Sequence, residues 1–143
     1  MLNRGDWYTA NPDYARAVSV YDTAIRLDRD NVEALSGVCW ARAVVGHTEQ
    51  AIKDCNESLR LRPDDDDTLD SRGLAYLKSG EFDKAIADYD AALKIDSQRA
   101  ASLYCRGLAK NKKGDGVGGD ADIAAAKAIQ ADIAEEFAGY GVK

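Results

Sequence analysis

Apolar residues recur along the chain at the three- and four-residue spacing of α-helices, in stretches of about 14 residues that turn residues separate. In the segment 66–99, Leu69 and Tyr76 mark one stretch, and Ser79 with Gly80 ends it. A second apolar stripe then runs over residues 82–93. Each such segment is predicted to be a pair of antiparallel helices, so the pattern indicates an all-α fold.

The chain also matches itself at a spacing of 34 residues, which indicates stacked repeats rather than one globular core. The register predicts a single domain over residues 1–143, made of successive helical hairpins. Its units are expected at 1–31, truncated at the N-terminal side, and at 32–65, 66–99 and 100–133, followed by a capping tail at 134–143. Identities between the second and third units fall at Leu35/Leu69, Ala41/Ala75, Gly46/Gly80, Ala51/Ala85, Ile52/Ile86, Asp54/Asp88 and Leu59/Leu93.

A glycine-rich stretch, 114–119, interrupts the fourth unit between its two helices. Its G-x-G-x-x-G spacing is that of a dinucleotide-binding turn, but such a turn follows a strand, and here the preceding residues continue a helix. A flexible loop is therefore expected, with the second helix starting late, near Gly119 or Asp120. The tail is expected to lay Phe137 and Tyr140 across the outer surface of that last helix as a cap.

Composition narrows the range of partners. The 143 residues are 45% apolar and 31% charged, and 19 basic against 25 acidic residues give a net charge of -6. An acidic chain is poorly suited to nucleic acid or to anionic lipid, so neither is expected as a partner. No apolar run approaches the roughly 20 residues of a membrane helix. A cytoplasmic location is favoured, and a periplasmic one stays open if a signal segment has been removed.

The residues capable of chemistry do not form a catalytic or metal-binding arrangement. The three cysteines, Cys39, Cys55 and Cys105, show no paired framework or C-x-x-C couple, so reduced, buried thiols are expected. His47, the one histidine, lies in a predicted turn, and the sequence around it shows no Cys or Asp/Glu arrangement that would make it a catalytic base or a metal ligand. The acidic run 64–67 lacks the spacing of a calcium loop and is expected to cap a helix. We expect no enzyme activity, no cofactor and no metal.

The repeat resembles the tetratricopeptide repeat (TPR) family, including its bacterial members. That family has a 34-residue helical hairpin with the pattern L-x3-G-x2-Y-x8-A-x3-Y-x2-A. The resemblance implies a right-handed α-solenoid of stacked hairpins, about four in number, whose first helices line a concave groove that binds peptides or protein segments. The pattern is carried here by Leu69, Gly73, Tyr76, Ala85, Tyr89 and Ala92.

The resemblance further implies which side chains line the groove of this chain. The groove is expected to be acidic at one edge and apolar along its floor, favouring a protein or peptide ligand with basic and apolar side chains. The lysine and asparagine clamp with which some family members hold a chaperone's C-terminal carboxylate is absent. The alternative function is self-association, with chains stacking end to end into homo-oligomers. The groove residues expected to bind are Glu33, Trp40, Asp67, Asp70, Leu74, Lys78, Tyr104, Leu108 and Asn111.

Charged residues 18 apart in successive units vary together along the chain. Asp54 is followed by Arg72, and Asp88 by Arg106. We therefore expect ion pairs between neighbouring hairpins at this spacing, with Asp122 left unpaired at the end of the array. A spacing of 16, which pairs Arg72 with Asp88 inside one hairpin, is the competing assignment, and one arginine could serve two aspartates.

Overall fold

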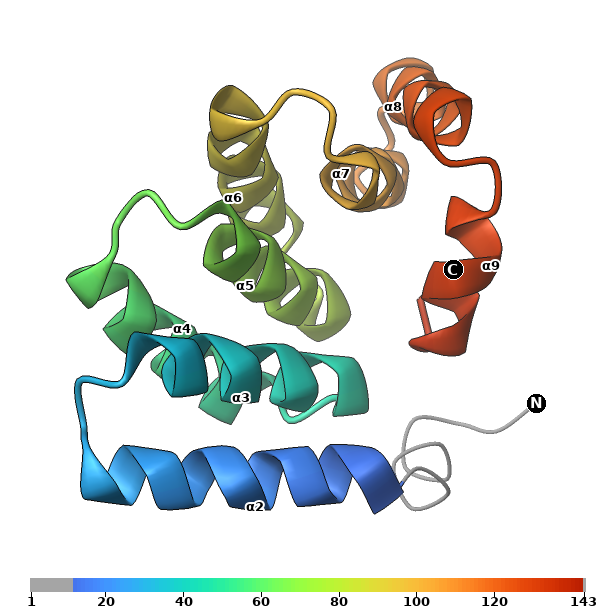
Figure 1. Ribbon diagram of the computed structural model, residues 1–143. Coiled ribbons are helices and arrows are strands. Elements are labelled where there is room, and N and C mark those ends of the chain that lie inside the picture. Colours follow the sequence, from blue (N-terminus) through green and yellow to red (C-terminus); the bar gives the residue numbers. More distant parts are fainter. Residues whose placement is uncertain (1–11, 143) are drawn as a thin grey trace.

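The computed structural model describes residues 12–142, and the expected first helix of the first unit lies outside them (Figure 1). Within this range the chain forms eight helices and no strand, in agreement with the all-α expectation. Three first helices begin at residues 32, 66 and 100, which are 34 residues apart. The helices are α2 (Pro12–Leu27), α3 (Val32–Val45), α4 (Thr48–Leu61), α5 (Asp66–Ser79), α6 (Phe82–Ile95), α7 (Ala100–Lys112), α8 (Gly116–Ile129) and α9 (Ile133–Gly139).

Glycines at equivalent places end the first helices of two hairpins. Gly46 and Gly80 adopt left-handed backbone with φ of 91° and 82°, a conformation that glycine reaches without the steric penalty of a Cβ. The Gly80 N–H donates to the carbonyl of Leu77 at 3.2 Å, which satisfies one of the last free carbonyls of α5. These turns reverse the chain so that the second helix runs back along the first.

The helix α8 begins at Gly116, so the expectation of a late start near Gly119 or Asp120 is wrong. The Asp115 carboxylate accepts a hydrogen bond from the Gly118 N–H at 2.9 Å and caps the helix. Of these glycines, Gly119 serves the close packing of α8 on α7. A Cβ on Gly119 would lie 2.6 Å from the Gly107 carbonyl oxygen, so α7 and α8 approach at a distance that only glycine permits.

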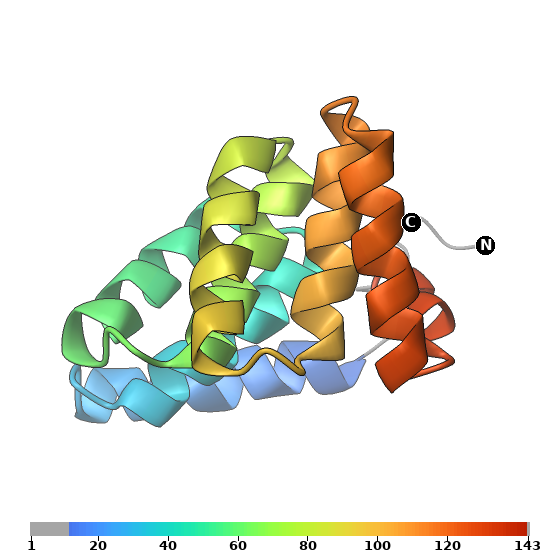
Figure 2. The same cartoon turned by 90° about the horizontal axis from the view of Figure 1, so that it is seen from above.

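The hairpins are arranged in two rows (Figures 1 and 2). The first helices α3, α5 and α7 contact one another in sequence, whereas the second helices α4, α6 and α8 do not contact one another. Each second helix packs between two first helices, α4 between α3 and α5 and α6 between α5 and α7. Because the first helices lie closer to one another than the second helices do, the stack of hairpins curves. The helices α3, α5 and α7 therefore form the concave side of the solenoid.

The interior is made of small side chains beside a few large ones. Tyr89 on α6 and Leu74 on α5 are among the most buried large side chains. Tyr89 fits because Gly73 faces it: a Cβ on Gly73 would lie 2.8 Å from the tyrosine ring. The repeat positions Gly73 and Tyr89 therefore form one close contact that joins the two helices of a hairpin.

Cys39 and Cys55 are joined by a disulfide that links α3 to α4, so the expectation of three reduced thiols is wrong. The two positions are 16 residues apart and their Cα atoms are separated by 5.4 Å, a usual spacing for a disulfide. Cys105 is the remaining thiol and is buried in α7. Cys39 and Cys55 stand one repeat before Gly73 and Tyr89, so the same contact between the two helices of a hairpin brings the two cysteines together.

The expected ion pairs between hairpins at a spacing of 18 are also wrong. Arg72 bonds Asp88 through Nε at 2.8 Å and Nη2 at 2.6 Å, the spacing of 16 that was the competing assignment. Arg106 bonds Asp122 in the same way at 2.8 Å, so Asp122 is paired as well. Asp54 bonds Arg42 of its own hairpin instead. Each bidentate pair thus staples the two helices of one unit.

Candidate functional site

The concave side carries two adjoining hollows between α3 and α5. The larger, of about 830 Å³, lies between the start of α3 and the loop before α5. The smaller, of about 290 Å³, continues along the row toward Trp40. Both hollows are lined by Ser36, Gly37 and Asp67, so they form one continuous depression, which we call the open end of the groove.

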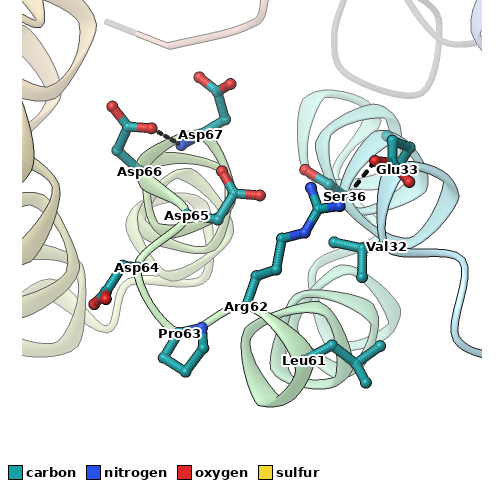
Figure 3. Close-up of a pocket in the computed structure, with 11 residues that line it drawn as sticks. Val32, Glu33, Ser36, Leu61, Arg62, Pro63, Asp64, Asp65, Asp66 and Asp67 are labelled. Atoms are coloured by element: carbon teal, nitrogen blue, oxygen red, sulfur yellow. Dashed lines mark hydrogen bonds and ion pairs between the residues drawn. The ribbon is translucent and has the colours of Figure 1, made fainter.

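Carboxylates dominate the larger hollow. Figure 3 shows Arg62 extending from the loop after α4 toward Glu33 on α3, with Asp65, Asp66 and Asp67 on the facing wall. Arg62 donates a hydrogen bond to Glu33 at 3.0 Å. The pKa of Glu33 is lowered chiefly by a backbone hydrogen bond at the start of α3, and further by this bond from Arg62. Five carboxylates and one guanidinium line this hollow, so its field favours a cation. The lining residues are Val32, Glu33, Ser36, Gly37, Leu61, Arg62, Pro63, Asp64, Asp65, Asp66 and Asp67.

Asp70 lies on the floor of the smaller hollow, and its carboxylate is already engaged. It is 7% exposed, accepts a hydrogen bond from Ser102 at 2.9 Å, and pairs with Arg99 at 3.3 Å. Burial raises the pKa of Asp70, and the Arg99 charge opposes that rise. Arg99 also pairs with Asp66 and Asp67, at 3.3 and 3.0 Å. Of the predicted acidic residues, Asp67 and Glu33 therefore face solvent and Asp70 does not.

The remaining part of the groove is covered by the chain's own C-terminal residues. Phe137 on α9 packs against Tyr104 on α7, with ring centroids 5.8 Å apart. Tyr140 packs edge-on against Trp40 on α3, with centroids 5.4 Å apart. The expectation that Phe137 and Tyr140 cross the outer surface of the last helix is therefore wrong. They turn inward and lie against the first helices.

Lys78 joins this covered part to the rest of the groove. Its ammonium donates to the carbonyl oxygen of Val44 in the last turn of α3 and to that of Tyr140. A lysine at a helix C-terminus is favoured by the free carbonyls and the negative end of the helix dipole. Lys78 thus holds the end of the C-terminal segment against α3.

The other predicted groove residues lie deeper or face elsewhere. Leu74 is 1% exposed and belongs to the core, while Leu108 is half-buried at its edge. Asn111 donates to Asp120 of α8 at 3.3 Å, so it lies against the second helix of its own hairpin. The structure therefore brings Glu33, Trp40, Asp67 and Asp70 together at the open end, and it places Lys78 and Tyr104 under the C-terminal segment.

Three contributors to the site were not anticipated from the sequence. Arg62 and Arg99 lie in or next to loops between hairpins, where repeat patterns give no expected orientation. The sequence does contain a sign that the repeat continues after α8, because Phe137 and Gly141 stand 34 residues after Leu103 and Gly107. That register indicates the start of another first helix, and α9 does begin there.

Among the described residues, no helix is long and apolar enough to cross a membrane.

Comparison with known proteins agrees with this fold. Residues 73–114 match the family model described as TPR repeat. No curated protein matches the chain. Solved structures do: a MamA protein is 19% identical, with 99% of this chain and 82% of that chain covered and a TM-score of 0.76. MamA of Desulfovibrio magneticus is 18% identical, covering 87% and 70%, with a TM-score of 0.75.

A thermophilic TPR protein of Thermus thermophilus is 17% identical, with 96% of this chain and 79% of that chain covered and a TM-score of 0.76. At these identities the likeness establishes the fold, which is the helical solenoid that the resemblance implied. The matched TPR repeat model covers residues 73–114, and the 34-residue period extends the same helical hairpin over the segments 32–65, 66–99 and 100–133.

Proposed function

We propose that this chain is a non-enzymatic interaction module that binds a segment of another protein in its concave groove. The observation that carries the proposal is the continuous depression between α3 and α5, in which a carboxylate-rich wall adjoins Trp40. Backbone and side chains of an extended peptide fit such a depression, and the first helices already place Glu33, Trp40 and Asp67 on one side of the molecule.

The ligand we propose carries a lysine or arginine next to an apolar side chain. The basic group lies against Glu33 and Asp67, whose side chains are 75% and 76% exposed. The apolar group lies against the half-buried ring of Trp40. Asp70 supports this surface from beneath, since its charge is balanced by Arg99 within the chain.

Selection from a displayed library of random peptides tests the proposal. We expect enriched peptides to pair a basic with an apolar residue, and we expect Glu33→Lys or Asp67→Lys to weaken their binding about tenfold at low salt. Glu49→Lys is the matched control, because Glu49 is an exposed carboxylate on α4, outside the groove. Equal binding by all three variants contradicts the proposed site.

Self-association by end-to-end stacking is the second candidate, and the outward face of α8 favours it. Ala121, Ala125 and Ala128 are exposed there, and Val117 and Ile129 are 88% and 43% exposed. Sedimentation of the chain over a range of concentrations tests this candidate. Stacking predicts a mass that rises with concentration and returns to that of one chain in Ala125→Glu, whereas a constant monomer excludes it.

A further inference from the structure

We propose that residues 133–142, the C-terminal segment, act as an internal ligand of the groove. The surface beneath them is then a second subsite, which accepts a short helical segment from a partner protein with two aromatic side chains three residues apart. This inference rests on the proposed function, and it adds a partner chemistry that the acidic open end does not supply.

The contacts of the segment define the subsite. Ile133 and Phe137, one helical turn apart, are 0% and 3% exposed, and Phe137 meets Tyr104. Tyr140, three residues further on, meets Phe137 at 5.2 Å and Trp40 at 5.4 Å between ring centroids. These are the edge-on and tilted arrangements that aromatic rings favour, and such anchors dominate the affinity of interfaces.

A polar contact fixes the end of the segment. Lys78 donates to the carbonyl of Tyr140, just after the last turn of α9, where main-chain carbonyls lack partners within the helix. Any short helix that ends at the same place offers the same acceptor, whatever its sequence. The subsite therefore packs its own side chains against two aromatic rings, and Lys78 donates a hydrogen bond to a carbonyl at the end of the bound helix.

The segment is joined to the array more loosely than a regular helix is. The helix α7 packs closely along α8 and α6, whereas α9 makes only sparse contact with α8 and α7. It spans seven residues and lacks a side-chain cap. Such a short helix is marginal alone, so its place depends on the aromatic anchors. A competing segment with equivalent anchors replaces it without unstacking a hairpin.

The test is a titration of a fluorescently labelled peptide with the sequence of residues 130–143. The acceptor is the full chain with Phe137→Ala and Tyr140→Ala, which keeps the groove and removes its internal anchors. We expect this variant to bind the peptide about tenfold or more tightly than the wild type, because occupied grooves lower the apparent affinity. The same peptide with both aromatic residues changed to alanine should not bind.

Two further variants distinguish binding at the subsite from nonspecific binding. Lys78→Met should weaken peptide binding, whereas Lys127→Met, an exposed lysine on α8, should leave it unchanged. In a Trp7→Phe background, Trp40 is the single tryptophan, and its emission should shift when the peptide binds. If the double variant loses its helical circular dichroism signal, Phe137→Leu takes its place under the same criterion.

Equal affinity of wild type and variant, or no binding to either, overturns the inference. A dimer of the wild-type chain that exchanges this segment would make a second copy the occupant and would also overturn it. The basic peptides selected at the open end provide the distinction from the proposed function. If they still bind while the 130–143 peptide does not, only this inference fails.

Discussion

At the scale of single residues, the buried carboxylate of Asp70 links α5 to Arg99 and to Ser102 on α7 beneath the groove. We predict that Arg99→Met lowers the free energy of unfolding by about 3 kcal/mol near neutral pH, because it leaves Asp70 buried without its cation. Asp70→Asn in the same chain should recover most of the loss, since an amide still accepts from Ser102. Urea unfolding followed by circular dichroism measures both values.

The loss should depend on pH in a definite direction. The pKa of Asp70 is raised in the folded chain, chiefly by burial, so the folded state binds this proton more tightly than the unfolded state. Its stabilising contribution is complete below the unfolded pKa and is lost as pH rises through the folded pKa. Removing Arg99 raises the folded pKa further, so Arg99→Met should cost less near pH 4 than near pH 7. A pH-independent loss contradicts this account.

Residue pairs also show where sequence reasoning ends. Spacings of 16 and 18 both connect arginines to aspartates in a repeat, and only the rotation of each helix about its axis decides between them. The structure selects 16, as in Arg72 with Asp88. Asp70 was expected to face a ligand, yet its neighbour Arg99 comes from the turn before the next hairpin, whose orientation the repeat pattern does not specify.

At the scale of helical elements, the close contact between α5 and α6 depends on a glycine, Gly73, at the point where the helices meet. We predict that Gly73→Ala destabilises the chain by about 1 to 3 kcal/mol, since its Cβ would lie 2.8 Å from the Tyr89 ring. Gly116→Ala is the matched control, because nothing lies within 4 Å of a Cβ at the start of α8. Thermal unfolding should show a lower midpoint for the first variant alone.

The disulfide between α3 and α4 gives a second test at this scale. Alkylation of the unfolded chain without reductant should modify Cys105 alone, as detected by mass spectrometry. After reduction, all three cysteines should react, and the free energy of unfolding should fall by about 3 kcal/mol for a loop of this length. Three modified cysteines without reductant would show that Cys39 and Cys55 are not linked.

The sequence predicts those helices that depend on local pattern, and it fails for those that depend on contacts between distant residues. Helices with an apolar stripe and a glycine at the turn, such as α5, are evident from local pattern, and their 34-residue spacing fixes the stacking. The start of α8 is not evident from the sequence, because glycine is a poor helix former in isolation. Within the first turn of α8, the contact of Gly119 with Gly107 requires glycine. The path of α9 depends on aromatic contacts with α3 and α7, distant in sequence.

At the scale of the whole molecule, stability in a stacked array is the sum of nearest-neighbour interfaces, so it should decrease toward the ends. The helices α5 and α6 have packed neighbours on both sides, while α9 makes sparse contact with the last hairpin. We predict that native-state hydrogen exchange is slowest in α5 and α6 and that residues 133–142 exchange faster by local opening. Mass spectrometry of proteolytic fragments measures this order.

The pattern under mild denaturant distinguishes local from global opening. Exchange of residues 133–142 should be nearly independent of low urea concentration, since their release exposes little surface, whereas exchange in α5 should accelerate with urea. Phe137→Ala should speed exchange in that segment and leave α5 unchanged. If the segment instead exchanges only with the whole chain, it is an integral part of the stack, and a partner could displace it only by unfolding the array.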